Sequence, residues 1–411
     1  MRTNRPEVLA PAGDMECLAA AVLYGADAVY LGAKQYGMRS APKNFDGEGL
    51  RLAVEHCHSR GVEVYLTCNT LPNNAEADAL PEFIRAAGCA GVDALIVADV
   101  GVLGLAKRTA PGLDVHISTQ TGVVNYLTAT ELYHMGASRV VLAREMSLGE
   151  IRAVRDKTPP ELELEAFVHG AMCMSFSGRC VVSQYLTSRD SNRGECSQPC
   201  RWGYHLMEEK RPGQFFPVFE DERGSYILNA QDLCMLGHID KLAEAGVGSL
   251  KIEGRAKSVY YVAAVTGAYR QAVDLYKADP KRYDPPQWLL EEVRKVSHRR
   301  YSTGFYLEGE PPGQHYACRG YVREWEVVAT VDGWRDGVLL CTERNRFGVG
   351  EELELLLPGE RPRPLTVAAL ADEEGTPLDT ARHPMMRLRI PCEQPVPAGA
   401  MLRRKTGKIY E

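Results

Sequence analysis

Four cysteines, Cys173, Cys180, Cys196 and Cys200, have the residue type and the spacing of a metal centre. Six residues separate the first two, fifteen the second and third, and three the last pair, so four thiols fall within 28 residues. The stretch that holds them, HGAMCMSFSGRCVVSQYLTSRDSNRGECSQPCRWGYHL, is rich in Gly, Ser and Arg, whereas cysteines that only fill a core lie among apolar residues. A set of four cysteines suits a 4Fe-4S cluster or a structural zinc ion.

The spacing of these cysteines favours iron and sulfur over zinc. Structural zinc sites use gaps of about two to four residues in both cysteine pairs, and the six-residue gap between Cys173 and Cys180 is longer. Arginines lie among the cysteines, and their charge would suit a cluster that carries net negative charge. We therefore expect the four cysteines to ligate a 4Fe-4S cluster, with zinc as the alternative.

The composition is that of a globular protein without a membrane segment. Of the 411 residues, 45% are hydrophobic and 25% are charged, and no run approaches the roughly 18 apolar residues of a membrane helix. No export signal is evident near the first residues, and twelve cysteines are too few for a disulfide scaffold, so we expect a cytoplasmic protein with free thiols. The net charge of −6 means that any RNA contact must be local.

The elements that must position the cysteines follow one repeated pattern. A short β-branched run ends at a small or polar residue, and an amphipathic stretch closed by Gly comes next. An eighth run follows an interruption of about 75 residues that contains the cysteines. The eight predicted strands span residues 7–13, 28–34, 62–69, 94–99, 115–121, 139–145, 164–170 and 249–254.

Eight β/α units favour a closed (β/α)8, TIM-like barrel over an open Rossmann-like sheet, and no strand is followed by a G-x-G-x-x-G turn. We predict a barrel over 1–310, with a cysteine-rich insertion at 171–247, and a linker at 311–320. From 321 to 411, short alternating runs separated by turn residues predict a small C-terminal all-β barrel domain.

Active sites of such barrels form where strands end and loops begin, and six polar residues are candidates there. Arg144 and Arg255 suit a small anionic co-substrate, because guanidinium binds carboxylate with two hydrogen bonds. His169 is a candidate general acid or base, or a neighbour of the cluster. The remaining candidates are Glu145, Lys251 and Glu253.

Structural roles are the alternatives for these candidates. Glu253 and Arg255 could form an ion pair, and Lys251 could pair with Glu165 inside the barrel. His169 could simply bond a backbone carbonyl.

RNA recognition would need basic and aromatic residues on the surface. Three stretches qualify by composition, and they would form a credible path for tRNA only if all lie on the side of the cysteines. They are Arg189, Arg193, Arg201 and Trp202; His298, Arg299, Arg300 and Tyr301; and Arg403, Arg404, Lys405 and Lys408.

Nearly the whole chain resembles the collagenase-like peptidase family U-32, and within it the tRNA hydroxylation protein P branch. The segments that carry the resemblance are EVLAPAGDMECLAAAVLYGADAVYLGAKQYGMRS, FVHGAMCMSFSGRC, SRDSNRGECSQPCRW, FEDERGSYILNAQDL, SLKIEGRAKSVYYV and RNRFGVGEELEL.

The resemblance implies an oxygen-independent hydroxylase that holds a 4Fe-4S cluster and hydroxylates the wobble uridine of tRNA at position 5, with prephenate as hydroxyl donor. Hydroxylation of rRNA or of a quinone precursor is an alternative, and so is a collagenase-like peptidase. The chain has neither an H-E-x-x-H helix nor a G-x-S-x-G elbow, which argues against a peptidase of those types. Whether the enzyme acts as a homo-oligomer or with a partner chain is open.

Overall fold

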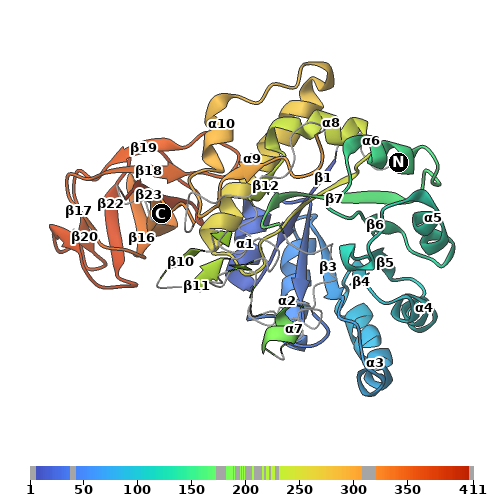
Figure 1. The fold of residues 1–411 in the computed structure, drawn as a ribbon. Coiled ribbons are helices and arrows are strands. Elements are labelled where there is room, and N and C mark those ends of the chain that lie inside the picture. Colours follow the sequence, from blue (N-terminus) through green and yellow to red (C-terminus); the bar gives the residue numbers. More distant parts are fainter. Residues whose placement is uncertain are drawn as a thin grey trace.

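The computed structural model describes residues 6–37, 43–172, 231–307 and 321–406, together with 182–187 and a few short pieces between 189 and 226. A β/α barrel is followed along the chain by an all-β part, which lies beside helices α9 and α10 in Figure 1.

Eight parallel strands close into the barrel. Each strand pairs with the next along the chain, and the last, β13, closes the ring by pairing with both β7 and β1. The prediction of a TIM-like barrel is therefore confirmed. The strands are β1 (Glu7–Pro11), β2 (Ala28–Gly32), β3 (Glu63–Cys68), β4 (Ala94–Val97), β5 (Asp114–Ile117), β6 (Arg139–Val141), β7 (Glu163–Gly170) and β13 (Ser249–Ile252).

The helices that cover the barrel begin at polar caps placed shortly after the strands. Asp14, Asp46, Asn73, Asp99 and Ser147 each accept a hydrogen bond from a backbone N–H of the first helical turn. Asp99, which follows β4, is thus used as a cap. The helices are α1 (Met15–Leu23), α2 (Gly47–His58), α3 (Asn74–Ala90), α4 (Val100–Thr109), α5 (Tyr126–His134), α6 (Leu148–Arg155), α8 (Ile239–Glu244), α9 (Val259–Ala278) and α10 (Gln287–Glu292).

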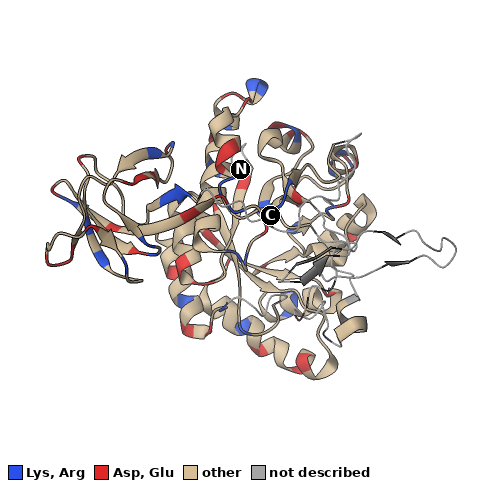
Figure 2. Ribbon diagram, turned by 60° about the vertical axis from the view of Figure 1, so that its left-hand side comes forward, with Lys and Arg blue, Asp and Glu red and all other residues tan. Residues whose placement is uncertain are grey.

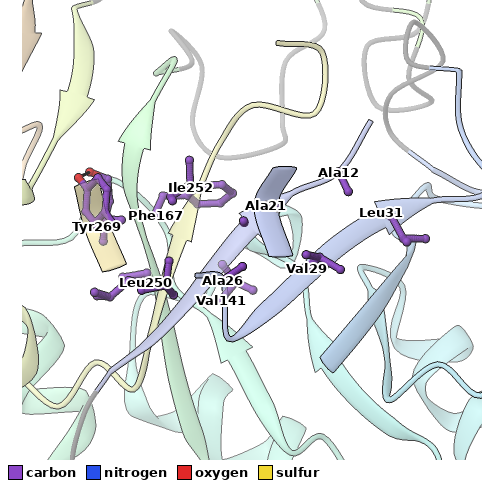
Figure 3. Packing of buried hydrophobic residues seen from close by; sticks show 14 of the residues in the cluster. Ala12, Ala21, Ala26, Val29, Leu31, Val141, Phe167, Leu250, Ile252 and Tyr269 are labelled. Carbon is purple, nitrogen blue, oxygen red and sulfur yellow. Dashed lines mark hydrogen bonds between the residues drawn. The ribbon is translucent and has the colours of Figure 1, made fainter. Parts of the chain in front are cut away.

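Alternating side chains divide the barrel wall into an outer and an inner face. Val29, Leu31, Leu250 and Ile252 belong to the large core between strands and helices (Figure 3). Inside the barrel, β1 to β4 contribute a small apolar cluster that includes Leu9, Tyr30 and Tyr65. The fully buried charged residues come instead from β6, β7 and β13, and Glu7 of β1 joins them at the end where the strands begin.

Two short strands extend the barrel sheet beside β7. β12 (Asp232–Cys234) pairs antiparallel with the end of β7, and β14 (Tyr301–Ser302) pairs parallel with β12. The last part of the predicted insertion, from 231 to 247, thus packs on the barrel. Other described pieces of the insertion are α7 (Val182–Thr187), β8 (Leu206–Met207), β9 (Phe215–Phe216), β10 (Phe219–Asp221) and β11 (Gly224–Tyr226).

The C-terminal part is an antiparallel half-barrel with a core of its own, as predicted. Its seven-stranded sheet has the order β19-β18-β23-β15-β16-β22-β20, and β17 pairs with β21. The strands are β15 (Trp325–Arg335), β16 (Val338–Glu343), β17 (Phe347–Gly348), β18 (Glu352–Leu356), β19 (Arg363–Thr366), β20 (Ala371–Asp372), β21 (Thr380–Ala381), β22 (Arg387–Pro391) and β23 (Met401–Lys405).

A buried arginine joins the two parts. Arg403 of β23 is fully buried and binds Glu292 of α10, Glu354 of β18 and the hydroxyl of Tyr260 on α9. The hydroxyl of Tyr24, the residue that follows α1, adds a 3.1 Å hydrogen bond to a carbonyl oxygen of β18.

Basic and acidic positions are interspersed along the helices in Figure 2. No helix in the described part of the chain is both long and apolar enough to cross a membrane.

Candidate active site at the barrel mouth

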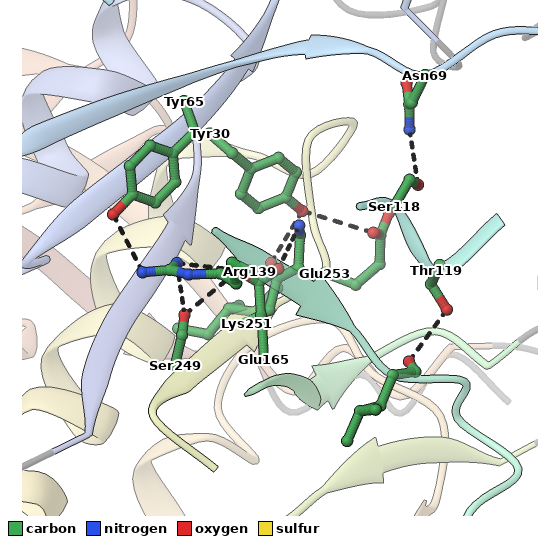
Figure 4. A network of polar contacts seen from close by, with 12 residues as sticks. Tyr30, Tyr65, Asn69, Ser118, Thr119, Arg139, Glu165, Ser249, Lys251 and Glu253 are labelled. Carbon is green, nitrogen blue, oxygen red and sulfur yellow. Dashed lines mark hydrogen bonds and ion pairs between the residues drawn. The ribbon is translucent and has the colours of Figure 1, made fainter. Parts of the chain in front are cut away.

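The end of the barrel where the strands begin is closed by a layer of buried charges. Arg139, 1% exposed, lies within 2.7 Å of a carboxylate oxygen of Glu7 and of Glu163. Its guanidinium also lies 3.0 Å from a carboxylate oxygen of Glu165 (Figure 4). Burial raises the pKa of Glu7, but the charge and hydrogen bonds of Arg139 outweigh that effect and lower it below its ordinary value. Since catalytic groups of such barrels lie at the opposite end, this layer has a structural role.

Lys251 lies one step further toward the mouth. Its Nζ is 2.6 Å from Oε1 of Glu165 and 4.7 Å from the ring centre of Tyr30 (Figure 4). The ring centre of Phe167 lies 5.5 Å from the same atom. The expected alternative, a buried pair with Glu165, is therefore present. A carboxylate and two aromatic rings thus contact the Lys251 side chain and hold it in place at the centre of the mouth.

Arg255 crosses the mouth from the end of β13 to the side of β2 and β3. It donates to Oγ1 of Thr67 at 3.2 Å and to the side chain of Asn44. A Cβ atom at Gly32 would lie 2.2 Å from Nη2 of Arg255, so only glycine at the end of β2 leaves room for the guanidinium. Thr67 and Asn44 were not among the predicted site residues.

Arg144 and Glu145 form the turn that follows β6, and both are half-buried. The Arg144 guanidinium lies 4.0 Å from the ring centre of Phe167, the ring that also faces Lys251. Its Nη1 donates to the carbonyl oxygen of Ala171 at 3.1 Å. Two predicted site residues from different strands are thus brought together around one aromatic ring.

Glu253 stands at the end of β13, next to Tyr30. The Tyr30 hydroxyl donates to the carbonyl oxygen of Ile252 at 2.9 Å and lies 3.5 Å from Oε2 of Glu253. On the neighbouring side of the mouth, Asn69 after β3 donates to Ser118 after β5 at 3.4 Å (Figure 4). The mouth therefore combines three cations with carboxylate, amide and hydroxyl groups, which is a set able to bind and orient an anionic molecule.

His169 is enclosed by tyrosines rather than directed to the mouth. Its ring is 5.1 Å from that of Tyr301 and 5.5 Å from that of Tyr269, and the hydroxyls of both lie within 3.4 Å of its nitrogens. Burial, with smaller effects from His298 and Lys257, lowers the pKa of His169 to about 3. The imidazole is thus neutral at ordinary pH, and this position suits a support of the β7 end better than proton transfer.

The four predicted cluster ligands, Cys173, Cys180, Cys196 and Cys200, lie outside the described residues. β7 ends at Gly170, and the chain is described up to Met172 at the barrel mouth, one residue before Cys173. Within the described ranges, no group of three or more His, Cys, Asp or Glu side chains is arranged to hold a metal ion.

In two of the three stretches expected to form a basic surface for RNA, several of the named residues are not available at the surface. Arg403 is fully buried between the two parts of the protein, and Arg404 is paired with Glu326 and Glu351. His298 and Arg299 are also buried. Most of the third stretch, at 189–202, lies outside the described residues.

Comparison with known proteins gives family matches over both parts of the chain. The model described as peptidase family U32 matches residues 13–315, and the model of the peptidase family U32 C-terminal domain matches 323–403.

Three relatives carry informative names. The tRNA hydroxylation protein P1 of Bacillus subtilis (strain 168) is 37% identical over 406 residues, 98% of this chain and 95% of its own. The tRNA hydroxylation protein P of Escherichia coli (strain K12) is 36% identical over 397 residues, 86% of each chain. The collagenase of Porphyromonas gingivalis (strain ATCC BAA-308 / W83) is 34% identical over 317 residues, 75% of each chain.

Proposed function

Because the chain belongs to peptidase family U32, and two of its relatives are named tRNA hydroxylation proteins, we propose that it is an RNA-modifying enzyme that hydroxylates tRNA. The observation that carries the proposal is the 37% identity to one of them over 98% of this chain. A match of that extent includes the C-terminal part as well as the barrel, so the proposal concerns the whole molecule. The finer reaction that we propose is 5-hydroxylation of the wobble uridine without molecular oxygen.

The cations of the mouth are the proposed binding groups for an anionic co-substrate, for which prephenate is our candidate. Arg255 is held in place by Thr67 and Asn44, and Arg144 and Lys251 lie beside Phe167. Fixed guanidinium groups bind carboxylates with two hydrogen bonds and lose little side-chain entropy in doing so. Next to these cations, the Glu253 carboxylate would balance part of their positive charge, and the Tyr30 hydroxyl would donate a hydrogen bond.

The proposed cofactor is a 4Fe-4S cluster on Cys173, Cys180, Cys196 and Cys200. The donor set fits, because four thiols occur within 28 residues that start where β7 reaches the mouth. If the hydroxyl moves from an alcohol carbon of the donor to the base (R–OH + R′–H → R–H + R′–OH), the base is oxidised by two electrons and the donor carbon is reduced by two. The donor is then the oxidant, and the reaction balances without molecular oxygen. An iron-sulfur cluster supplies one-electron transfer of the kind that such a reaction needs.

The test is the nucleoside composition of tRNA from a strain that lacks the gene. Mass spectrometry should show that hydroxylated wobble uridine is lost, restored by the wild-type gene, and not restored by genes carrying Cys200→Ala or Arg255→Gln. Unchanged tRNA nucleosides in the deletion strain would refute the tRNA assignment. Loss of a hydroxylated rRNA nucleoside or of a quinone instead would favour the alternative hydroxylase substrates.

A peptidase is the second candidate, and the relative named collagenase is the observation that favours it. A cysteine peptidase would use a single thiol as nucleophile, so it should cleave peptides without iron and lose activity on substitution of one cysteine only. Gelatin cleavage by the iron-free protein, compared across the four cysteine-to-alanine variants, separates this activity from hydroxylation.

A further inference from the structure

The ends of β7 and β13 meet at one tight junction, and both lead directly into candidate site residues. The Glu253 N–H donates to the carbonyl oxygen of His169 at 2.9 Å, and the Tyr261 hydroxyl donates to the carbonyl oxygen of Glu253 at 2.8 Å. Glu253 and Arg255 follow β13, and residues 171 and 172 lead from β7 toward Cys173. We propose that Tyr261 is a positioning residue that holds these two strand ends in register for the hydroxylation proposed above, on which this role rests.

Two glycines make room for the tyrosine. A Cβ atom at Gly254 would lie 2.6 Å from Cε1 of the Tyr261 ring. A Cβ atom at Gly170 would lie 2.6 Å from the Glu253 carbonyl oxygen and 3.0 Å from the Tyr261 hydroxyl. Gly170 also has a φ of +101°, a conformation that side chains other than glycine rarely adopt. At Gly170 and Gly254 the backbone therefore lies so close to Tyr261 that any side chain larger than that of glycine would clash.

Tyr261 is itself held firmly enough to act as such a support. It lies in the first turn of α9, where its N–H donates to the capping Ser258 side chain, and it is 3% exposed. The Lys257 ammonium lies 5.2 Å from its ring centre, and the His169 ring lies 6.0 Å from it. Because the ring is buried and closely packed, its hydroxyl keeps a fixed position relative to α9, and the hydrogen bond to Glu253 then fixes the junction relative to α9.

The end of a third strand, β6, is also bonded to this junction. Arg144, after β6, donates to the carbonyl oxygen of Ala171, the residue that follows Gly170. Groups from β6, β13 and α9 thus converge on the last residues of β7. Because the junction fixes Glu253 relative to residues 170 and 171, loosening it should displace the Glu253 and Arg255 side chains without unfolding the barrel.

The test compares Tyr261→Phe with Tyr260→Phe. Each variant keeps the ring and removes one buried hydroxyl, but the Tyr260 hydroxyl bonds the Lys295 carbonyl oxygen and Arg403 at the boundary with the C-terminal part. Hydrogen–deuterium exchange of the peptides that span 168–172 and 252–256 should speed up about five-fold in Tyr261→Phe alone, because one buried hydrogen bond is lost there. In the same variant kcat for tRNA hydroxylation should fall about tenfold with KM unchanged.

Three outcomes would overturn the proposal: unchanged exchange in Tyr261→Phe, faster exchange at the junction in both variants, or an equal fall in kcat in both. A wild-type protein that holds the junction amides but hydroxylates no RNA would refute the proposed function instead. Exchange in Tyr261→Phe would still decide whether the tyrosine locks the strand ends.

Discussion

Glu165 is the residue whose neutralisation should reveal how the barrel interior is stabilised. Its carboxylate is fully buried and lies 2.6 Å from the Lys251 ammonium and 3.0 Å from the Arg139 guanidinium. In Glu165→Gln the side chain keeps its shape, but its amide group has half the acceptors and no charge. Arg139 retains Glu7 and Glu163, whereas Lys251 loses the carboxylate that lies 2.6 Å from its ammonium group.

The expected loss of unfolding free energy follows from these contacts. A charge-assisted hydrogen bond contributes about 1.5–3 kcal/mol, and Glu165 makes two of them with buried partners. Removing one partner of a buried ion pair costs about 3–5 kcal/mol for the same reason, because the remaining charge stays out of water. We therefore expect Glu165→Gln to lower the free energy of unfolding by about 3–5 kcal/mol.

Glu163→Gln is the matched control, on the same strand and with the same Arg139 partner. The Glu163 side chain is 26% exposed, so water screens its ion pair and we expect a loss of about 1 kcal/mol. Equilibrium urea unfolding, monitored by circular dichroism, measures the free energy of unfolding of both variants. Adding Lys251→Met to Glu165→Gln should recover about 2 kcal/mol, since the stranded charge is removed. Equal losses in the two single variants, or no recovery in the double variant, would refute this account.

Three further predictions concern other parts of the molecule. Gly32→Ala should push the flexible end of the Arg255 side chain aside. Unfolding assays should show a change of less than about 1 kcal/mol in the free energy of unfolding, and activity assays should show that the rate of hydroxylation falls at least about tenfold. Because burial lowers the pKa of His169 to about 3, the unfolded chain takes up a proton below about pH 6.5 that the folded chain excludes. As the pH is lowered from about 6.5 to about 3, the free energy of unfolding should then fall, and it should fall by less in His169→Asn, measured by urea unfolding. Arg403→Met should cost about 3–5 kcal/mol in thermal unfolding, because it leaves the buried Glu292 and the half-buried Glu354 without that cation.

The sequence was sufficient to predict the barrel because its signals are local. Each of the eight strands was predicted within a few residues of its observed bounds, since a β-branched run between a glycine and a cap has few other structures to adopt. Apart from Lys251 with Glu165, which the sequence analysis named as an alternative, the partners of the buried charges were not predicted, because they lie far apart in the chain. Arg139 binds Glu7, 132 residues away, and Arg403 binds Glu292, 111 residues away.

The same limit applies to the candidate site. Arg144, Glu253 and Arg255 were chosen as candidates because they follow strands, and Lys251 because it lies near the end of one, and these positions place all four near the mouth. Tyr261 was missed because it lies in an apolar helix pattern, where a tyrosine is usually a core residue. The role that we propose for its hydroxyl depends on the close approach of the β7 and β13 ends, which the sequence does not reveal.

The way in which the barrel closes also sets an order of events during synthesis. Glu7 of β1 pairs with Ser249 of β13, so the first strand has no partner on one side until about 250 residues have left the ribosome. Until then β1 and β7 are open sheet edges, which attract other chains. Chains that stop before residue 249 should therefore aggregate rather than accumulate as partial barrels.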